Sequence, residues 1–326
     1  MATYIGLDLG GTNIKISVFD DFFHKLGEKR TPTEVRFGSE HVLNRIYDAV
    51  LALLDELHLT CQDITCMGIG VPGILDIKNG ISRFSPNFPK WEEVPIVAWM
   101  ESHLHIPTYI DNDARVNLYG EWKFGAGKGL KNMVFMTFGT GLGAGLILDG
   151  KLYAGTNDNA GEIGHIRLSE FGPVGYGKSG SFEGFCSGGG IAQIAKMKVL
   201  ERLQMGQKVG FCKTPDDLGK LDAKAVAAAA DAGDKLALEI YAESGRKLGA
   251  GLSIIVDILN PQAIVIGSIF TRSRNLLWKH ARAVLETEAL PLARKACKIL
   301  PAKLGENIGD YAALSVAAYR ISQNKL

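Results

Sequence analysis

Short apolar segments alternate with longer amphipathic segments along most of the chain. Residues 4–9 are mainly apolar, and residues 14–20 place Lys15 and Ser17 between apolar neighbours. These patterns predict two strands, and the glycine-rich turn between them predicts a β-hairpin. Residues 39–57 instead repeat apolar side chains every three or four positions. That spacing predicts an amphipathic helix.

The same criteria predict the remaining elements. Further strands are expected at 64–71, 108–110, 133–138, 146–148, 151–153 and 263–266. Further helices are expected at 95–103, from 114, from 188, and at 223–232, 236–259, 273–285 and 312–322. Residues 79–91 and 171–187 are rich in glycine, proline and polar side chains and are expected to be irregular. Strands that alternate with helices in this way predict the α/β class.

The chain of 326 residues is longer than a single hydrophobic core usually supports, so we expect two domains. The first is a smaller N-terminal α/β domain, formed by residues 1–118 together with about 305–326. The second is a larger C-terminal α/β domain, formed by residues 119–304. The glycine-rich stretch 125–129 is expected to serve as a hinge between them.

Composition excludes several classes of protein. The formal net charge is +1, so no global field favours nucleic acid or an anionic membrane. The five cysteines lack CxxC spacing and are expected to be reduced thiols. The chain has no leader-like start and no run of about twenty apolar residues. We therefore expect a soluble, cytoplasmic protein without nucleic-acid or membrane partners.

The turn between the strand at 108–110 and the helix from 114 carries the sequence Asp111-Asn112-Asp113. Open α/β folds bind ligands where a strand ends and a helix begins. We expect Asp111 to cap the helix, which leaves the amide of Asn112 and the carboxylate of Asp113 facing outward together. The alternative is that all three residues are turn formers and caps.

Two glycine-rich turns could cradle phosphates. One lies within Asp8-Leu9-Gly10-Gly11-Thr12-Asn13, and the other spans 139–145. Each joins two predicted strands, so neither is the strand-to-helix turn of a dinucleotide-binding fold. Free N–H groups in small turns bind anions, and a carboxylate such as Asp8 could hold magnesium through water. The alternative for each is a tight hairpin without a ligand. The similarity of the two hairpins suggests two related halves with a cleft between them.

Glu162 and His165 are three residues apart, so one helical turn would place both on one side. The alternative for His165 is a structural histidine. The glycine-rich segment 171–187 follows, and Glu183 is the carboxylate that it contains.

In order and spacing, these motifs resemble the ROK family of repressors and sugar kinases, which belongs to the hexokinase/actin/heat-shock-70 superfamily. The matching residues are Asp8-Leu9-Gly10-Gly11-Thr12, Gly70-Val71-Pro72-Gly73, Asn112-Asp113, Gly139-Thr140-Gly141-Leu142-Gly143, Glu162-Ile163-Gly164-His165, and Asn260-Pro261 through Gly267. The resemblance covers nearly the whole chain. It implies a two-domain actin-like ATPase fold (ribonuclease H-like), with five-stranded mixed sheets flanked by helices and a central cleft. It also implies a homodimer.

The resemblance implies a role for each matching residue. Asp113 would be the general base that takes a proton from a sugar hydroxyl, as phosphoryl transfer to an alcohol requires. The implied sugar contacts are Gly73, Asn87, Asn112, Asp113, Glu162, His165 and Glu183. The implied contacts to ATP are Asp8, Gly10, Gly11, Thr12, Asn13, Lys15, Gly139, Thr140, Gly141, Gly143 and Gly267. Asp8 would hold Mg²⁺ through water.

The chain departs from the family pattern at two places. Many members carry zinc-binding cysteines at positions that here hold Val174, Tyr176 and Ser181. Valine supplies no ligand atom and serine is a poor zinc ligand, so zinc is not expected. The second ring nitrogen of His165 would then need another partner, for which Tyr176 or Ser181 is our hypothesis. The second departure is Ser268, where the family usually repeats glycine.

The leading hypothesis is an ATP-dependent kinase for the 6-hydroxyl of a hexose, with glucose first among the substrates. Mannose, fructose, allose and N-acetylmannosamine are alternatives, because the motifs contact hydroxyls that these sugars share. A transcriptional repressor of the same family is a second hypothesis. The first strand begins at Tyr4, which leaves no room before it for a DNA-binding domain. A sugar sensor without catalytic activity is a third.

Overall fold

The computed structural model describes residues 2–85 and 88–305 of the chain. The described residues divide into two compact units. Unit 1 contains the chain up to Gly129 together with the short segment Gly155–Asp158, and unit 2 contains Leu130–Ala154 and Asn159–Gly305. By this division unit 1 extends beyond the boundary expected at residue 118. Residues 306–326, which we assigned to the first domain, lie outside the described residues.

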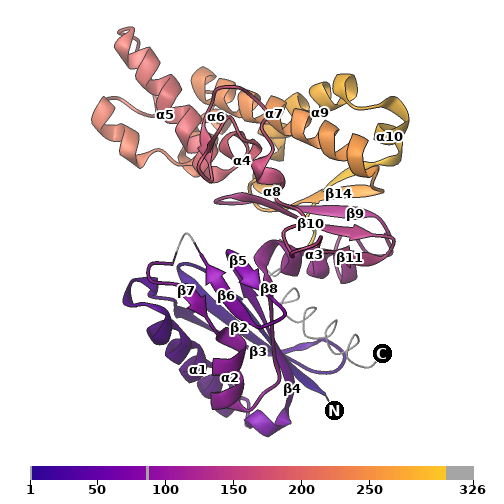
Figure 1. Ribbon diagram of the computed structural model, residues 1–326. Coiled ribbons are helices and arrows are strands. Elements are labelled where there is room, and N and C mark those ends of the chain that lie inside the picture. Colours follow the sequence, from indigo (N-terminus) through magenta and orange to yellow (C-terminus); the bar gives the residue numbers. More distant parts are fainter. Residues whose placement is uncertain (1, 86–87, 306–326) are drawn as a thin grey trace. The chain divides into compact units, whose positions relative to one another are not determined.

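Unit 1 is built on a five-stranded mixed sheet (Figure 1). Its strands are β1 (Thr3–Leu9), β2 (Asn13–Phe19), β3 (Lys25–Pro32), β4 (Ile64–Val71) and β8 (Thr108–Asn112), in the order β3-β2-β1-β4-β8. The first three strands form an antiparallel meander, and β4 and β8 add in parallel beside β1. The helices of unit 1 are α1 (Ser39–Glu56), α2 (Ile96–Leu104) and α3 (Asp113–Lys123), with 3₁₀ turns at Val35–Phe37 and Cys61–Asp63.

Unit 2 repeats this topology with different strands. Its sheet contains β9 (Met133–Phe138), β10 (Leu142–Leu148), β11 (Lys151–Tyr153), β14 (Ala263–Ile266) and β15 (Lys298–Pro301), in the order β11-β10-β9-β14-β15. Again three strands form an antiparallel meander, and two more add in parallel beside the first. The expectation of two five-stranded mixed sheets is confirmed, as is the suggestion of two related halves.

The helices of unit 2 gather against its sheet (Figure 1). They are α4 (Phe182–Phe185), α5 (Gly188–Gln204), α6 (Ala223–Asp231), α7 (Lys235–Leu259), α8 (Ile269–Arg272), α9 (Arg274–Glu288) and α10 (Pro291–Ala296). Two 3₁₀ turns, Ile163–His165 and Pro215–Lys220, and a small hairpin of β12 (Val174–Gly175) and β13 (Lys178–Ser179) complete the unit. Among the described helices, none combines the length and apolar character that a membrane crossing requires.

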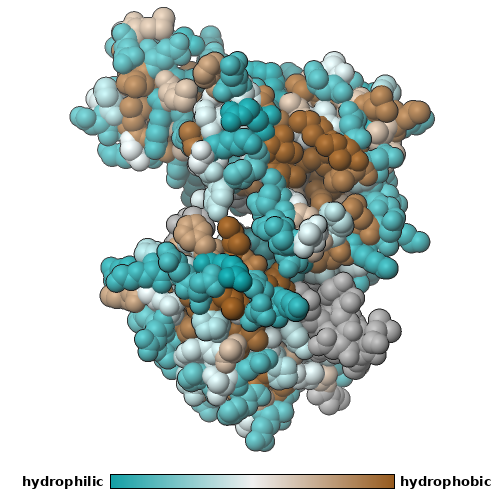
Figure 2. All heavy atoms as spheres, in the orientation of Figure 1, coloured by the Kyte–Doolittle hydropathy of each residue, from teal (hydrophilic) through white to brown (hydrophobic). Residues whose placement is uncertain are grey.

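The helix α1 is held in unit 1 by burial of one of its faces. In unit 1 the apolar stripe of α1, including Val42, Ile46 and Val50, is fully buried in the same cluster as Ile5 and Ile16 of the sheet. Burying such side chains contributes about 1.5–3 kcal/mol each. Figure 2 shows hydrophilic residues over the outer side of this layer, as expected for an amphipathic helix.

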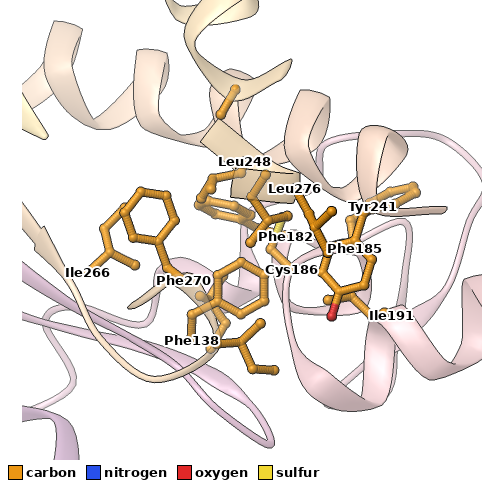
Figure 3. Close-up of a cluster of buried hydrophobic side chains, with 14 of the residues drawn as sticks. Phe138, Phe182, Phe185, Cys186, Ile191, Tyr241, Leu248, Ile266, Phe270 and Leu276 are labelled. Carbon is orange, nitrogen blue, oxygen red and sulfur yellow. The ribbon is translucent and has the colours of Figure 1, made fainter. Parts of the chain in front are cut away.

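The core of unit 2 includes the ends of the two strands that precede Gly139 and Gly267. Phe138 ends β9 and Ile266 ends β14, and both are fully buried. They lie in one cluster with Phe182, Phe185 and Phe270 (Figure 3). Each loop that follows one of these strands therefore starts from a packed aromatic or branched side chain.

Several expected bounds are wrong. Residues 79–91 are not irregular throughout, because they contain β6 (Ile81–Phe84), the central strand of a three-stranded sheet with β5 (Ile74–Asp76) and β7 (Glu92–Val94). Residues 171–187 likewise contain β12, β13 and α4. Strands β3 and β15 were not predicted. Both are edge strands with exposed or half-buried residues, so neither carries a strong apolar signal. The helix expected at 312–322 lies outside the described residues.

Candidate active site

The turn at 111–113 is organised differently from our expectation. Asp111 does not cap α3; it is buried in β8, with one carboxylate oxygen 3.1 Å from Nε of Arg115. Asn112 is the N-cap, and its Oδ1 accepts a hydrogen bond from the N–H of Ala114 at 3.0 Å. Asp113 is the first residue of the helix and is exposed. The helix cap therefore lies one residue later than predicted, at Asn112 and not at Asp111.

The amide of Asn112 also connects two segments of unit 1. Its Nδ2 donates a hydrogen bond to the carbonyl oxygen of Gly73 at 3.1 Å. Gly73 has a φ of +97°, and a Cβ there would lie 2.2 Å from the carbonyl oxygen of Phe84. Only glycine fits this position without displacing its neighbour. The structure thus brings Gly73, Asn112 and Asp113 together. Asn87, the fourth predicted sugar contact of this half, lies outside the described residues.

The first phosphate-loop candidate is the turn between β1 and β2. Leu9 pairs with Ile14, and Gly10, Gly11 and Thr12 lie between the strands. A Cβ on Gly11 would meet no heavy atom within 4 Å, so the outer side of the turn is open to a ligand.

Thr33 braces this turn from within. Its Oγ1 donates to the carbonyl oxygen of Gly10 at 2.6 Å, and its N–H donates to that of Thr12 at 2.9 Å. Thr33 is fully buried and was not predicted, because the contact joins residues that are far apart in the sequence.

The two charged residues predicted beside this turn face each other across the strands. Asp8 of β1 pairs in register with Lys15 of β2. Nζ of Lys15 lies 3.5 Å from a carboxylate oxygen of Glu28 on β3, and the Lys15 side chain is mostly buried. Hydrogen bonding to Lys25 holds the pKa of Glu28 at about 2, with further lowering from Arg30 and from the charge of Lys15. Glu28 therefore stays ionised beside Lys15 at neutral pH.

The second phosphate-loop candidate is shorter than expected. Strand β10 begins at Leu142, which pairs with Phe138, so the turn contains Gly139, Thr140 and Gly141. Gly143 is not in the loop but in the strand, where its N–H donates to Oγ1 of Thr137 at 3.1 Å.

This second turn is seated on the first turn of α5. The N–H of Gly188 donates to the carbonyl oxygen of Gly139 at 2.7 Å. Ser187 caps the helix by accepting a hydrogen bond from the N–H of Gly190 at 2.9 Å. Helix N-termini carry partial positive charge, which favours phosphate nearby. We did not predict that the glycines at 188–190 belong to this site. The predicted helix start at Gly188 could have indicated it, because helix N-termini favour phosphate.

Gly267 and Ser268 follow β14 and lie beside the same loop. The N–H of Gly267 donates to the carbonyl oxygen of Met136 at 2.9 Å. A Cβ on Gly139 would lie 3.6 Å from Oγ of Ser268. Ser268 has φ 57° and ψ −117°, a region that side-chain-bearing residues rarely adopt. This backbone conformation explains why glycine suits the position, and serine holds it under strain.

The structure brings Glu162, His165 and Glu183 together in unit 2. The N–H of His165 donates to the carbonyl oxygen of Glu162 at 3.1 Å, which closes a 3₁₀ turn. A Cβ on Gly164 would lie 2.3 Å from the carbonyl oxygen of Leu142 and 3.2 Å from Cβ of Glu183. The absence of a side chain at Gly164 therefore lets this turn pack between the phosphate loop and α4.

The surroundings of Glu162 shift the pKa of its carboxyl group. Its pKa is raised above the ordinary value, first because neighbouring atoms displace water from the charged group. The charge of Glu183 raises the pKa further, and that of His165 opposes the rise. Glu162 as a whole residue is exposed, so solvent weakens these charge effects.

The positions of the missing cysteines do not fit zinc. Val174 offers no ligand atom. Ser181 is buried and caps α4, where its Oγ accepts a hydrogen bond from the N–H of Gly184 at 3.1 Å. Tyr176 packs the edge of its ring against His165, with centroids 5.2 Å apart. Ser181 is thus engaged within its own loop, and Tyr176 contacts His165 through its ring. Within 2–85 and 88–305, no three His, Cys, Asp or Glu side chains are grouped to hold a metal ion.

Comparison with known proteins places this geometry in a family. The model of the ROK family matches residues 4–319. A glucokinase from Halalkalibacterium halodurans is 33% identical over 308 residues, covering 94% of this chain and 92% of that protein. A xylose repressor from Caldicellulosiruptor bescii is 28% identical over 269 residues, covering 82% of this chain and 66% of the repressor.

A solved structure agrees with these matches. The crystal structure of a ROK family glucokinase from Streptomyces griseus, in complex with glucose and AMPPNP, is 28% identical to this chain. The two share a TM-score of 0.77 over 96% of this chain and 98% of the other. The expected two-domain actin-like ATPase fold is confirmed by this likeness and by the repeated sheet topology. The chain therefore belongs to the ROK family.

Proposed function

We propose that this protein is an ATP-dependent kinase that phosphorylates the 6-hydroxyl of a hexose, with glucose as its preferred substrate. The observation that carries the proposal is the exposed carboxylate of Asp113 at the start of α3, next to an Asn112 amide fixed on Gly73. The identity of 33% with a glucokinase supports the choice of sugar.

Asp113 is the general base in this proposal. As the sugar O6 attacks the γ-phosphorus of ATP, the hydroxyl proton passes to the carboxylate of Asp113. The bond from the γ-phosphorus to the bridging oxygen breaks, and ADP leaves. The protein contributes little covalent chemistry, so catalysis depends on positioning and on charge stabilisation around the phosphoryl group.

The other predicted residues bind and orient the substrates. Asn112, Glu162, His165 and Glu183 offer amide, imidazole and carboxylate groups to sugar hydroxyls, with Gly73 as backbone support. The turns at Gly10–Thr12 and Gly139–Gly141 offer backbone N–H groups to phosphates, and Gly267 lies beside the second turn. Backbone donors of this kind bind anions without a side chain.

The residues beside the first turn fit a magnesium ion bound with the nucleotide. Asp8 is the next-to-last residue of β1, three positions before Gly11, and carboxylates are ligands that magnesium accepts, commonly with water between. When bound, magnesium neutralises charge on the transferred phosphoryl group. Zinc is not part of the proposal, and elemental analysis of the purified protein tests that point.

A catalytically inactive sugar sensor is a second candidate, because xylose repressors are among the relatives. Both candidates bind a sugar, and turnover separates them. The proposal also includes a homodimer in the cytoplasm, and light scattering on the purified chain tests the dimer.

A coupled assay of ADP release tests the proposal. ATP-magnesium is supplied with a panel of hexoses and N-acetylhexosamines, without added zinc. Turnover on glucose above the other sugars is expected. If no sugar gives ADP release while calorimetry still shows glucose binding, the sensor hypothesis replaces the kinase hypothesis.

A further inference from the structure

Arg115 is a buried cation in the first turn of α3, the helix that begins at Asp113. Its side chain is only 5% exposed, and it lies between two carboxylates. Nε is 3.1 Å from Oδ1 of Asp111, which is 2% exposed, and Nη1 is 3.5 Å from Oδ1 of Asp158, which is 41% exposed. One arginine therefore joins the end of β8 to a segment more than forty residues later in the chain.

The contribution of this arrangement to the stability of the fold does not by itself explain it. Neither Nε nor Nη1 of Arg115 makes a well-aligned hydrogen bond in the structure, although both are buried. Buried charges are costly to remove from water, and apolar residues of similar volume often stabilise a protein as well or better. A buried arginine with this geometry is better explained by a role in placing the segments that it joins.

Asp158 belongs to an unusual segment. Residues 155–158 pack with unit 1, whereas the residues on both sides, up to Ala154 and from Asn159, belong to unit 2. Asp158 itself has a φ of +62°, a left-handed conformation that asparagine and aspartate tolerate better than most residues. Four residues later the chain reaches Glu162, the first side chain of the cluster with His165 and Glu183.

We propose that Arg115 is a positioning residue for sugar binding, which clasps residues 155–158 to the first turn of α3. The Asp111 contact ties the guanidinium to the strand that ends at Asn112. The Asp158 contact ties it to the chain that enters the turn of Glu162 and His165. The clasp thus fixes, within unit 1, the last residues of the chain before the turn of Glu162 and His165. This inference rests on the proposed function in assigning sugar binding to these residues.

The geometry separates this role from general support of the fold. Asp158 is partly exposed, and exposed ion pairs usually add little to stability. Removing its charge should therefore leave folding intact and change only the placement of its segment. Nucleotide contacts at Gly139–Gly141 lie outside the clasp, so affinity for ATP should stay unchanged.

The experiment compares Asp158→Asn, Arg115→Lys, Arg115→Met and the double variant Arg115→Met/Asp158→Asn with the unaltered full-length protein. Glu170→Gln is the matched control, because Glu170 is an exposed carboxylate of unit 2 outside the clasp. Glucose affinity is measured by calorimetry, KM is measured separately for glucose and ATP, and Tm is measured by thermal unfolding.

Asp158→Asn should raise Kd and KM for glucose by about three- to tenfold, with KM for ATP within about twofold and Tm within about 2 °C. Arg115→Met should weaken glucose binding at least as much and also lower Tm, because it leaves the buried Asp111 carboxylate without its cation. The double variant should bind glucose as Arg115→Met does, because Asp158 acts through Arg115. Arg115→Lys should retain part of the affinity through its charge. Glu170→Gln should change none of these quantities.

Unchanged glucose affinity in Asp158→Asn would overturn the clasp, as would equal losses of glucose and ATP affinity accompanied by a fall in Tm. The calorimetric measurement of glucose affinity does not depend on turnover. If the unaltered protein binds glucose but transfers no phosphoryl group, the kinase proposal fails, and the Kd values still decide whether the clasp exists.

Discussion

The carboxylate of Glu183 accepts a hydrogen bond from the backbone N–H of Leu142, with Oε2 2.9 Å from the nitrogen. Leu142 follows the Gly139–Gly141 turn directly, and Glu183 lies in the first turn of α4. A residue predicted to contact sugar therefore also holds the end of a predicted phosphate loop. In the proposed function one side chain thus affects the binding of both substrates, and substitutions can separate the two effects.

Replacements of Glu183 by glutamine and by alanine should behave differently. A glutamine side chain keeps an acceptor oxygen for the N–H of Leu142, so Glu183→Gln should raise KM for glucose and leave KM for ATP nearly unchanged. Glu183→Ala leaves that buried N–H without its partner, a cost of about 1–3 kcal/mol. We expect it to raise both KM values, the ATP value by about three- to tenfold. Steady-state kinetics with each substrate varied in turn distinguishes these results, and equal ATP KM values in the two variants would contradict the account.

Asn112 should contribute to stability as well as to sugar binding. Asn112→Ala removes the cap on Ala114 and the bond to the Gly73 carbonyl, and each is worth about 1 kcal/mol. Asn112→Ser keeps a capping oxygen but cannot donate across to Gly73. Denaturant unfolding should show about 2 kcal/mol lost in Asn112→Ala and about half of that in Asn112→Ser. Equal losses in the two would mean that the bond to Gly73 contributes nothing.

Ser268→Gly should stabilise the protein. A strained backbone position of this kind costs about 1–3 kcal/mol, and glycine relieves most of it while losing some entropy on folding. A gain of about 1 kcal/mol corresponds to a rise in Tm of about 2–4 °C. Ser187→Gly is a suitable control, because Ser187 has an ordinary negative φ and caps α5, so this variant should lower Tm. A fall in Tm for Ser268→Gly would show that the serine side chain outweighs the strain.

Glu162 should reduce stability as the pH rises. Because its folded pKa is raised, the folded state holds the proton more tightly than the unfolded state. The penalty is absent below the unfolded pKa, grows as pH rises towards the folded pKa, and is fully present above it. Glu162→Gln should thus be slightly more stable than the unaltered protein at neutral pH, by about 0.5 kcal/mol or less for this exposed site. The difference should vanish near pH ~3, below the ordinary glutamate pKa, which unfolding curves at two pH values can check.

The strands and helices that sequence predicts best are those with long apolar patterns. Strands β4 and β9 begin and end where expected, because all but one residue of each is buried and turn residues flank both. The helix α7 is displaced by one residue at its start, where Asp234 supplies the cap. Edge strands such as β3 carry no such run, since their pairing comes from a neighbour and not from burial.

In the candidate site, too, features set by local sequence were predicted and contacts between distant segments were not. Local motifs indicate Asn112, Asp113 and the glycine turns, because the conformation of a turn is determined by residues adjacent in the sequence. The cap was predicted at Asp111 but belongs to Asn112. Both residue types cap helices well, and only the buried pairing of Asp111 with Arg115 decides between them. The brace at Thr33 and the contact from Glu183 to Leu142 join distant segments and become visible only in the fold.

The most direct test of the central claim is the turnover of Asp113→Asn together with its affinity for glucose. We expect kcat to fall by about 10²–10⁴-fold, the usual contribution of a general base, while Kd for glucose changes little. Asparagine keeps the size of the side chain and its capacity for hydrogen bonds with sugar hydroxyls. Near-normal turnover in Asp113→Asn, in a protein that still binds glucose, would contradict the assignment of Asp113 as the base.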